Sequence, residues 1–202
     1  LKPNHYAISL SGEPTMYPRL DEMIGLLRSK YGARSVFLVT NGQVPSMIEK
    51  LADTGSLPTQ LYISVTAPNR NLGVVIHRPV YRDFWERLVK SLKLMNDLWG
   101  RTRRVIRLTL IKGYNMDEKF MDEFASLIRL AEPDFVEVKA YMHLGYSTMR
   151  LSKSNMPSHE EVKAFSERLA NRLEGFEVVD EQVESRIVLL RNLDSPVPLK
   201  HP

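Results

Sequence analysis

A glycine and a glutamate stand together near the front of the chain, in the stretch ISLSGEPTMYP, residues 8–18. An apolar run stops at Gly12, a residue that lets the backbone turn sharply and approach a ligand without a Cβ in the way. Glu13 follows at once, and Pro14 fixes the backbone that leaves it. A carboxylate at such a turn can hold an ammonium group by a charge-assisted hydrogen bond, or it can cap the helix that follows.

Polar residues recur at two-residue spacing inside several apolar runs. Successive side chains of a strand point to opposite faces, so residues two apart share a face. Because a parallel strand that is buried on both faces is nearly all apolar, these side chains indicate that something polar meets one face of a sheet. The alternative is that they satisfy one another, for example as an ion pair between Glu137 and Lys139. The sets are Ser9 and Ser11, Ser64 and Thr66, Arg107 and Thr109, and Glu137, Lys139 and Tyr141.

The elements that must position these residues alternate along the chain. Runs rich in branched and aromatic residues, each ending at a turn signal, predict strands. Apolar residues at helical spacing predict amphipathic helices between them. Strand alternating with helix predicts right-handed β-α-β units and a parallel sheet. The predicted strands are 5–12, 35–42, 61–67, 104–113 and 135–142, the helical stretches are 17–32, 84–100, 116–133 and 158–175, and a hairpin is expected from 176–181 and 185–192.

Length and composition limit what these patterns can mean. The chain has 202 residues, of which 43% are hydrophobic and 26% charged, which is typical of one soluble α/β domain. No apolar run approaches the roughly 18 residues of a membrane helix, and no leader pattern is recognised, so we expect a cytoplasmic protein without a membrane partner. The net charge of +4 is compatible with a nucleic-acid partner.

The strand end SLSGEPTMYP resembles the Gly-Gly-Glu-type motif of radical S-adenosylmethionine enzymes. More specifically, an ordered set of segments is similar to the tRNA wybutosine-synthesising family, the 4-demethylwyosine synthases. The resemblance runs from about Asn4 to about Asn192 and implies an α/β fold, a partial parallel (β/α) barrel of radical-SAM type with a C-terminal β-hairpin. The segments are AISLSGEPTMYP, FLVTNG, LYISVTAP, RPVYRDFWERLVKSL, RLTLIKGYNMD, PDFVEVKAYMHLGYS and NMPSHEEV.

The resemblance also implies a reaction. Such enzymes cleave S-adenosylmethionine reductively at a 4Fe-4S cluster, and the resulting 5′-deoxyadenosyl radical abstracts hydrogen from the methyl group of N1-methylguanosine in tRNA-Phe. Two carbons of pyruvate then close a third ring, which gives 4-demethylwyosine. The implied partners are therefore tRNA-Phe, pyruvate and an electron donor, and the implied cofactors are S-adenosylmethionine and iron–sulfur clusters.

Matching segments carry site residues over from the family. Glu13, in the turn with Ser11 and Gly12, would take the amino group of the methionyl moiety. Lys139 on the last parallel strand is the candidate catalytic residue, in contact with substrate or with the methionyl carboxylate. The other cofactor-binding candidates are Asn41, Ser64 and Thr66 around the carboxylate and the ribose, and Arg107 and Thr109 facing the same lumen.

The chain departs from the family pattern because it has no cysteine. In the family a Cys-x3-Cys-x2-Cys motif after the first barrel strand holds the radical-generating cluster, and clusters are built on thiolates. One interpretation is that residues 1–192 are the C-terminal portion of a longer barrel, followed by a Pro-rich tail at 193–202. The other is a cluster-free relative that keeps the binding surface. The apolar run 5–12 favours the first interpretation, because an uncovered hydrophobic edge strand is an aggregation hazard.

Basic and aromatic residues occupy several predicted loops, at 77–79, 101–104, 112–115 and 143–153. Arginine and lysine bind phosphates, and tyrosine or histidine can stack on an unpaired base. The stretch 101–104 also contains residues that open a strand. The histidines show no metal-ligand spacing, so no metal site is expected. The candidate tRNA-binding residues are Arg78, Lys112, Tyr146 and Arg150.

Two other functions remain open at this point. Lys139, beside apolar neighbours at a strand end, could form a Schiff base in a metal-free lyase, and a covalent adduct with pyruvate after borohydride reduction would favour that function. A cluster-free RNA-binding module would instead bind tRNA with a steep salt dependence and have no affinity for S-adenosylmethionine.

Overall fold

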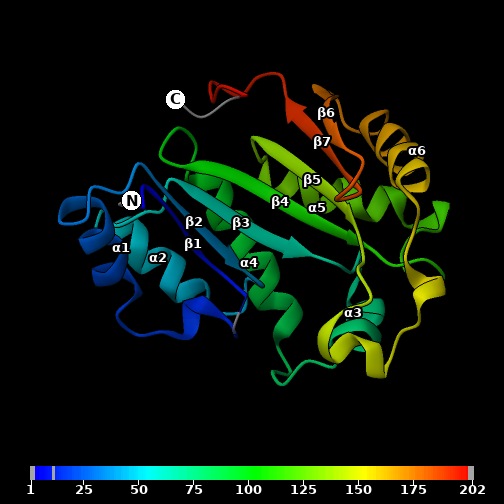
Figure 1. Cartoon of the computed structure of the whole chain (residues 1–202), viewed down its shortest axis with the longest axis horizontal. Coiled ribbons are helices and arrows are strands. Elements are labelled where there is room, and N and C mark those ends of the chain that lie inside the picture. Colours follow the sequence, from blue (N-terminus) through cyan, green and yellow to red (C-terminus); the bar gives the residue numbers. More distant parts are fainter. Residues whose placement is uncertain (1–2, 11, 200–202) are drawn as a thin grey trace.

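The computed structural model describes residues 3–10 and 12–199. A seven-stranded sheet in the order β1-β2-β3-β4-β5-β7-β6 forms its centre (Figure 1). The first five strands run parallel, and β7 is antiparallel to both β5 and β6. The predicted parallel barrel with a C-terminal hairpin is therefore confirmed, as an open barrel whose edges are β1 and β6. The strands are β1 (His5–Ile8), β2 (Ser35–Thr40), β3 (Gln60–Val65), β4 (Arg103–Leu110), β5 (Phe135–Ala140), β6 (Phe176–Gln182) and β7 (Ile187–Asn192).

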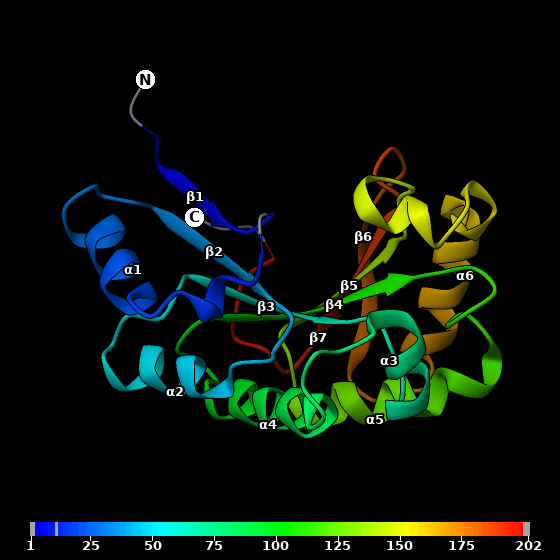
Figure 2. The same cartoon turned by 90° about the horizontal axis from the view of Figure 1, so that it is seen from below.

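Helices cover one face of the curved sheet and leave the other face open, as Figure 2 shows. The four predicted helices form, and each buries one apolar stripe, such as Phe124 and Ile128 of α5 against the sheet. Two shorter helices, α2 and α3, were not predicted. They are only nine and eight residues long, so each offers few repeats of the apolar spacing. The helices are α1 (Leu20–Ser29), α2 (Pro45–Asp53), α3 (Arg70–His77), α4 (Phe84–Asp97), α5 (Met121–Ala131) and α6 (His159–Ala170).

Alternation along the central strands separates core from lumen. Ile63, Ile106 and Val136 belong to the buried core shared with the helices, whereas Ser64 and Arg107, next to them in sequence, are only half-buried. Successive strand residues point to opposite faces, so the polar sets lie on the concave face. The expectation that they share one face of the sheet is confirmed for the sets on β3, β4 and β5. It is not confirmed for Ser9, which follows the end of β1.

The first strand is shorter and more exposed than predicted. It ends at Ile8 instead of residue 12, because Leu10 takes a positive φ of 81° that leaves the extended conformation. Its residues alternate between exposed and half-buried at the edge of the sheet. The predicted site residue Ser11 lies outside the described residues.

The predicted basic stretch 101–104 lies at the opposite end of the strands from the lumen opening, because Arg103 begins β4. Arg104 is fully buried and forms an ion pair with Asp134 at 3.0 Å, so it is unsuited to bind a phosphate. The segment after β7 packs at this same amino end: Ser195 is buried and its Oγ donates to Asp134 Oδ1 at 2.7 Å. Arg191 donates to the carbonyl of Val197 at 3.3 Å.

Candidate functional site

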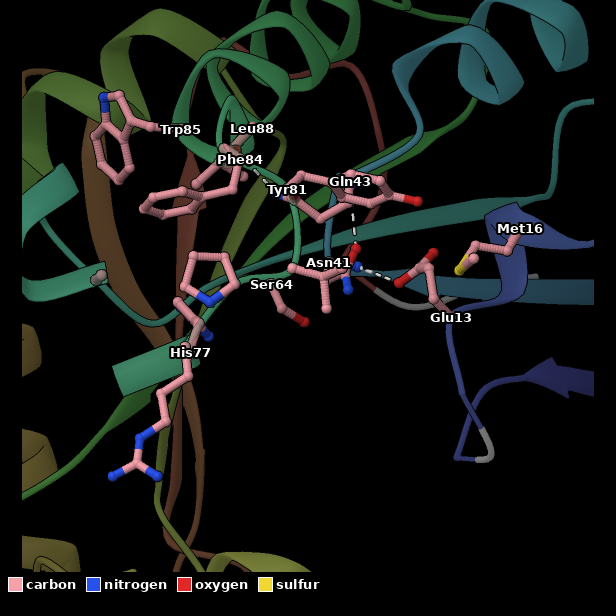
Figure 3. Close-up of a pocket in the computed structure, with 14 residues that line it drawn as sticks. Glu13, Met16, Asn41, Gln43, Ser64, His77, Tyr81, Phe84, Trp85 and Leu88 are labelled. Atoms are coloured by element: carbon pink, nitrogen blue, oxygen red, sulfur yellow. Dashed lines mark hydrogen bonds between the residues drawn. The ribbon is translucent and has the colours of Figure 1, made fainter. Parts of the chain in front are cut away.

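A cavity of about 380 Å³ opens at the carboxyl ends of the first strands. This is within the range of about 300–1,000 Å³ that is usual for small-molecule sites. Its floor comes from residues that follow β2 and lie on β3, and its walls come from the segment between α3 and α4 and from the start of α4 (Figure 3). The lining residues are Glu13, Met16, Asn41, Gln43, Ser64, Ala67, His77, Arg78, Pro79, Val80, Tyr81, Phe84, Trp85 and Leu88.

Glu13 is held at the mouth of this cavity by four hydrogen bonds. Its Oε1 accepts from the Thr15 backbone N–H at 3.1 Å and from the hydroxyls of Thr15 and Thr40 at 2.5 Å each. Among the described residues, the backbone N–H of Asn41 is the only donor to its Oε2, at 2.8 Å. The carboxylate therefore caps the short turn Pro14–Met16, while Oε2 keeps capacity for one more donor. In this geometry Glu13 can cap the turn and hold an ammonium group at the same time.

The turn before Glu13 depends on glycine, since Gly12 has φ of +74°, and a Cβ there would meet open space. A second glycine, Gly42, has φ of +72° where the chain leaves β2, and a Cβ there would press on Ile63 and Leu88. The backbone of this second turn brings Asn41 to Glu13 (Figure 3). The chain segments that follow β1 and β2, far apart in sequence, thus meet at the Glu13 carboxylate.

Gln43 is a cavity residue that the sequence analysis missed. Its Nε2 donates to the carbonyl of Phe84 at 3.0 Å, which fixes the orientation of the amide. Its Oε1 is buried and has no partner among the described residues. An unsatisfied buried acceptor is costly, so it points to a ligand donor in the cavity. An amide directly after the predicted strand end TNG was the available signal.

The apolar wall is built by the segment that follows α3. Phe84 packs closely on Gly73 of α3, where a Cβ would lie 2.9 Å from the ring, and it meets Trp85 edge-on. Arg87 lies over the Tyr81 ring at 4.2 Å and donates to the carbonyl of Gln43 at 3.1 Å. These contacts fix an aromatic surface of the kind that contacts flat ligands.

Arg107 lies on the concave face, as expected, but it does not line this cavity. Its guanidinium forms a two-pronged pair with Glu137, with Nε to Oε1 at 2.7 Å and Nη2 to Oε2 at 3.2 Å. It also lies over the Tyr62 ring at 4.9 Å. Burial and then the Glu137 carboxylate raise the pKa of Tyr62. The suggested Glu137–Lys139 pair is thus wrong, because Glu137 bonds to Arg107.

Lys139 lies on the same concave face, in register with Thr109 of β4. It is half-buried. Within residues 3–10 and 12–199, no hydrogen bond or ion pair occupies its amine. The predicted catalytic lysine is therefore an amine without a protein acceptor in the described part of the chain.

Thr66 and Thr109 are placed by a buried asparagine that sequence reasoning missed. Asn115 Nδ2 donates to the carbonyl of Thr66 at 2.7 Å and of Thr109 at 2.8 Å. Its Oδ1 accepts from the Ile111 N–H at 2.6 Å. Thr66 lines a neighbouring cavity of about 190 Å³ that also contacts Arg150, instead of the Glu13 cavity.

The four predicted tRNA-binding residues have different surroundings. Arg78 lines the Glu13 cavity, and Tyr146 is 90% exposed. Lys112 pairs with Glu161 at 2.5 Å. Arg150 donates to two carbonyls at the end of α3, at 2.9 and 3.0 Å. Burial and then the Arg150 charge lower the pKa of His77.

Among the described residues, no group of three or more histidine, aspartate or glutamate side chains could hold a metal ion. None of the described helices is long and apolar enough to span a membrane.

Two family models match the chain. Residues 2–125 match the radical SAM superfamily, and residues 130–192 match the family described as wyosine base formation. The boundary between the two regions falls at the end of α5. Together they include the Glu13 cavity and the strand that carries Lys139.

Curated relatives share this sequence over nearly its whole length. The S-adenosyl-L-methionine-dependent tRNA 4-demethylwyosine synthase of Pyrococcus abyssi is 44% identical over 193 residues, which are 96% of this chain and 55% of that protein. The Methanocaldococcus jannaschii protein of the same name is 37% identical, over 95% of this chain and 57% of its own length. The chain thus spans about half the length of these archaeal relatives.

Solved structures agree with the sequence comparisons. The structure described as TYW1 with a lysine-pyruvate adduct bound has a TM-score of 0.82 and 35% identity, over 95% of this chain and 58% of that one. An archaeal TYW1 has a TM-score of 0.77 and 33% identity, over 96% of this chain and 59% of its own. The chain therefore belongs to the radical SAM superfamily, and its residues 130–192 are similar to the family described as wyosine base formation.

Proposed function

We propose that this chain is the part of a tRNA 4-demethylwyosine synthase that binds S-adenosylmethionine and pyruvate. The reaction would convert N1-methylguanosine of tRNA-Phe, in the cytoplasm, with pyruvate and a one-electron donor as the other reactants. The observation that carries the proposal is the placement of two groups on one concave face: the fixed Glu13 carboxylate at an apolar cavity, and the unpaired Lys139 amine.

The cavity fits S-adenosylmethionine in its chemistry. Glu13 Oε2 has one protein donor and can accept a second bond from an ammonium group. The aromatic wall at Phe84 and Trp85 suits a nucleoside, and Gln43 Oε1 offers an acceptor for an exocyclic amine. When bound, S-adenosylmethionine supplies hydrogen abstraction from a methyl group. The residues of this chain do not fit a 4Fe-4S cluster, because it has no thiolate.

Lys139 is the residue that we assign to pyruvate. Among the described lysines, Lys50, Lys90, Lys112, Lys119 and Lys163 form ion pairs. Lys30, Lys93 and Lys153 are exposed. Lys139 alone is half-buried on the concave face without a partner, which is the setting of a nucleophilic amine.

The covalent step balances without a further reactant. The neutral Lys139 Nζ attacks the keto carbon of pyruvate, a proton passes from nitrogen to the former carbonyl oxygen, and water leaves as the imine forms. The structurally similar TYW1 is described with a lysine-pyruvate adduct bound, so such an adduct occurs in a related radical SAM protein. A trapped pyruvate therefore does not favour a metal-free lyase over the family reaction, contrary to the expectation from sequence.

Borohydride reduction in the presence of pyruvate tests the proposal. The wild-type chain should gain one reduced pyruvate, located at Lys139 by peptide mass spectrometry. Lys139→Met should lose the adduct, whereas Lys112→Met, which removes an exposed and ion-paired amine, should keep it. An adduct on another lysine, or none on the wild type, would refute the assignment.

A further inference from the structure

The segment between α3 and α4 carries two arginines whose charges are not used within the structure. In the described part of the chain, the side chains of Arg34, Arg78 and Arg82 are the only arginine side chains without a hydrogen bond or ion pair to another described residue. Arg34 lies before β2, at the amino end of the sheet. Arg78 and Arg82 lie within one five-residue segment, 78–82, at the mouth of the Glu13 cavity.

The backbone of Arg78 is held in an unfavourable conformation. It ends α3 with φ of 48° and ψ of 60°, in the left-handed region. Glycine is the usual residue at such a helix end, and an L-residue there is destabilised by contact between its Cβ and the following carbonyl. A strained position that keeps a long cationic side chain points to a role for that side chain.

A groove of about 410 Å³ runs along this segment. It shares five lining residues with the Glu13 cavity, so the segment borders both, and Figure 3 shows two of the shared residues, Tyr81 and Phe84. The nearby carboxylates are already neutralised, since Asp83 bonds to Arg87 and Glu86 to Arg70. The residues common to both are Arg78, Pro79, Val80, Tyr81 and Phe84.

We propose that Arg78 and Arg82 are positioning residues that bind backbone phosphates of the RNA substrate. Neither guanidinium has a partner among the described residues. The planar fork of N–H donors on each one fits the oxygens of a phosphate. Between them Val80 is 93% exposed and offers an apolar contact to a ribose or an unstacked base. The phosphates held here flank the nucleotide that reaches the cavity next door. This inference rests on the proposed function, which supplies the RNA.

Salt dependence of RNA binding measures these contacts directly. Each phosphate contact to a single strand contributes about 0.7 to the slope of log K against log salt. With a synthetic hairpin RNA that has an unpaired loop, Arg78→Gly and Arg82→Ala should each lower the slope by about 0.7. Arg34→Ala is the matched control, because it also removes an arginine without a described partner, but at the far end of the sheet. This variant should leave the salt slope unchanged. Glycine at position 78 keeps the backbone conformation, so misfolding does not explain a loss there.

The outcomes separate this inference from the proposed function. If both variants bind the hairpin as Arg34→Ala does, or if the wild type does not bind it, the inference is overturned even when pyruvate is still trapped at Lys139. If trapping fails while both slopes fall, the pyruvate assignment is lost and the RNA surface stands. Polyglutamate tests for a general anion site. If it displaces the hairpin from the wild type but not from Arg78→Gly, the segment binds anions of any kind and the RNA assignment is overturned.

Discussion

Two arginine–carboxylate pairs join β4 to β5, three residues apart along both strands, and they have opposite environments. Arg104 and Asp134 are 0% exposed and lie at the amino end of the sheet, against the helices. Arg107 and Glu137 have side chains 26% and 12% exposed and lie on the concave face. An arginine–carboxylate pair is thus found both in the packed interior at the amino end of the sheet and on the open concave face.

The buried pair is fully satisfied. Asp134 accepts from the backbone N–H of Arg104 at 2.7 Å, from its guanidinium at 3.0 and 3.3 Å, and from the Ser195 hydroxyl at 2.7 Å. The guanidinium also lies over Trp99 at 4.6 Å. A buried charge in such a network is not easily replaced, because loss of one partner leaves the other unpaired. This end of the molecule is built for stability.

The concave face shows the opposite organisation. Lys139 and Gln43 Oε1 have no protein partner among the described residues, and Arg78 occupies a strained backbone conformation. These features lower stability, and they cluster at the carboxyl ends of the strands, where α/β sheets bind their ligands. At the amino end, Arg103 Nε and Arg191 Nε are also buried without a partner among the described residues. The contrast therefore teaches that position matters: the free groups of the lumen lie beside a cavity or on the concave face, and this difference can be tested from both ends.

The largest effect is expected at the buried pair. Asp134→Asn leaves the Arg104 guanidinium buried without a counter-charge and should lower the free energy of unfolding by about 3–5 kcal/mol. Urea denaturation measures it. Ser195→Ala removes only one neutral donor and should cost about 1 kcal/mol. If Asp134→Asn costs no more than Ser195→Ala, the amino end is not the stabilising end.

A gain in stability is expected at the working end. Arg78→Gly relieves a left-handed L-residue, worth about 1–2 kcal/mol, and adds flexibility to the unfolded chain, which costs about 0.5–1 kcal/mol. The net result should be a stabilisation of up to about 1.5 kcal/mol in the same urea experiment. Arg82→Gly, four residues along and without a positive φ, should destabilise instead. A loss of stability in Arg78→Gly would remove the argument from strain.

The smallest effect concerns the pair on the concave face. Glu137→Gln keeps an amide oxygen that can accept from Arg107, whose side chain is 26% exposed to solvent, so it should change the free energy of unfolding by less than about 1 kcal/mol. It should also lower the raised pKa of Tyr62, since one of the two causes of that shift, the carboxylate, is gone. Nuclear magnetic resonance titration of labelled tyrosine measures the change, with Glu177→Gln on β6 as the control.

The sign of the pH dependence follows from the same tyrosine. Its pKa is raised in the folded protein, so the folded state keeps the proton at a pH where the unfolded state loses it. Stability from this group is therefore complete below about pH 10 and declines as the pH rises further. The decline should be smaller in Glu137→Gln, and an equal decline would show that burial alone sets the shift.

Local patterns in the sequence predicted the sheet, the hairpin and the polar face, because alternation and turn residues are encoded within a few positions. They also brought Glu13, Asn41 and Ser64 to one cavity. They did not predict that Glu137 would bond to Arg107, since that choice depends on the register between two strands. The buried role of Asn115 was missed for a similar reason, because one of its acceptors directly follows β3 and the other lies on β4.

The strand order has a consequence for synthesis on the ribosome. The free edge of β5 is covered by β7, although β6 leaves the ribosome first and ends outermost. The nascent sheet therefore keeps an unpaired edge until residues 187–192 emerge, and the Asp134 network closes only when Ser195 follows. Pairing of the β5 edge during synthesis therefore waits for β7, and the interval before that is when chaperones would have an exposed strand edge to shield.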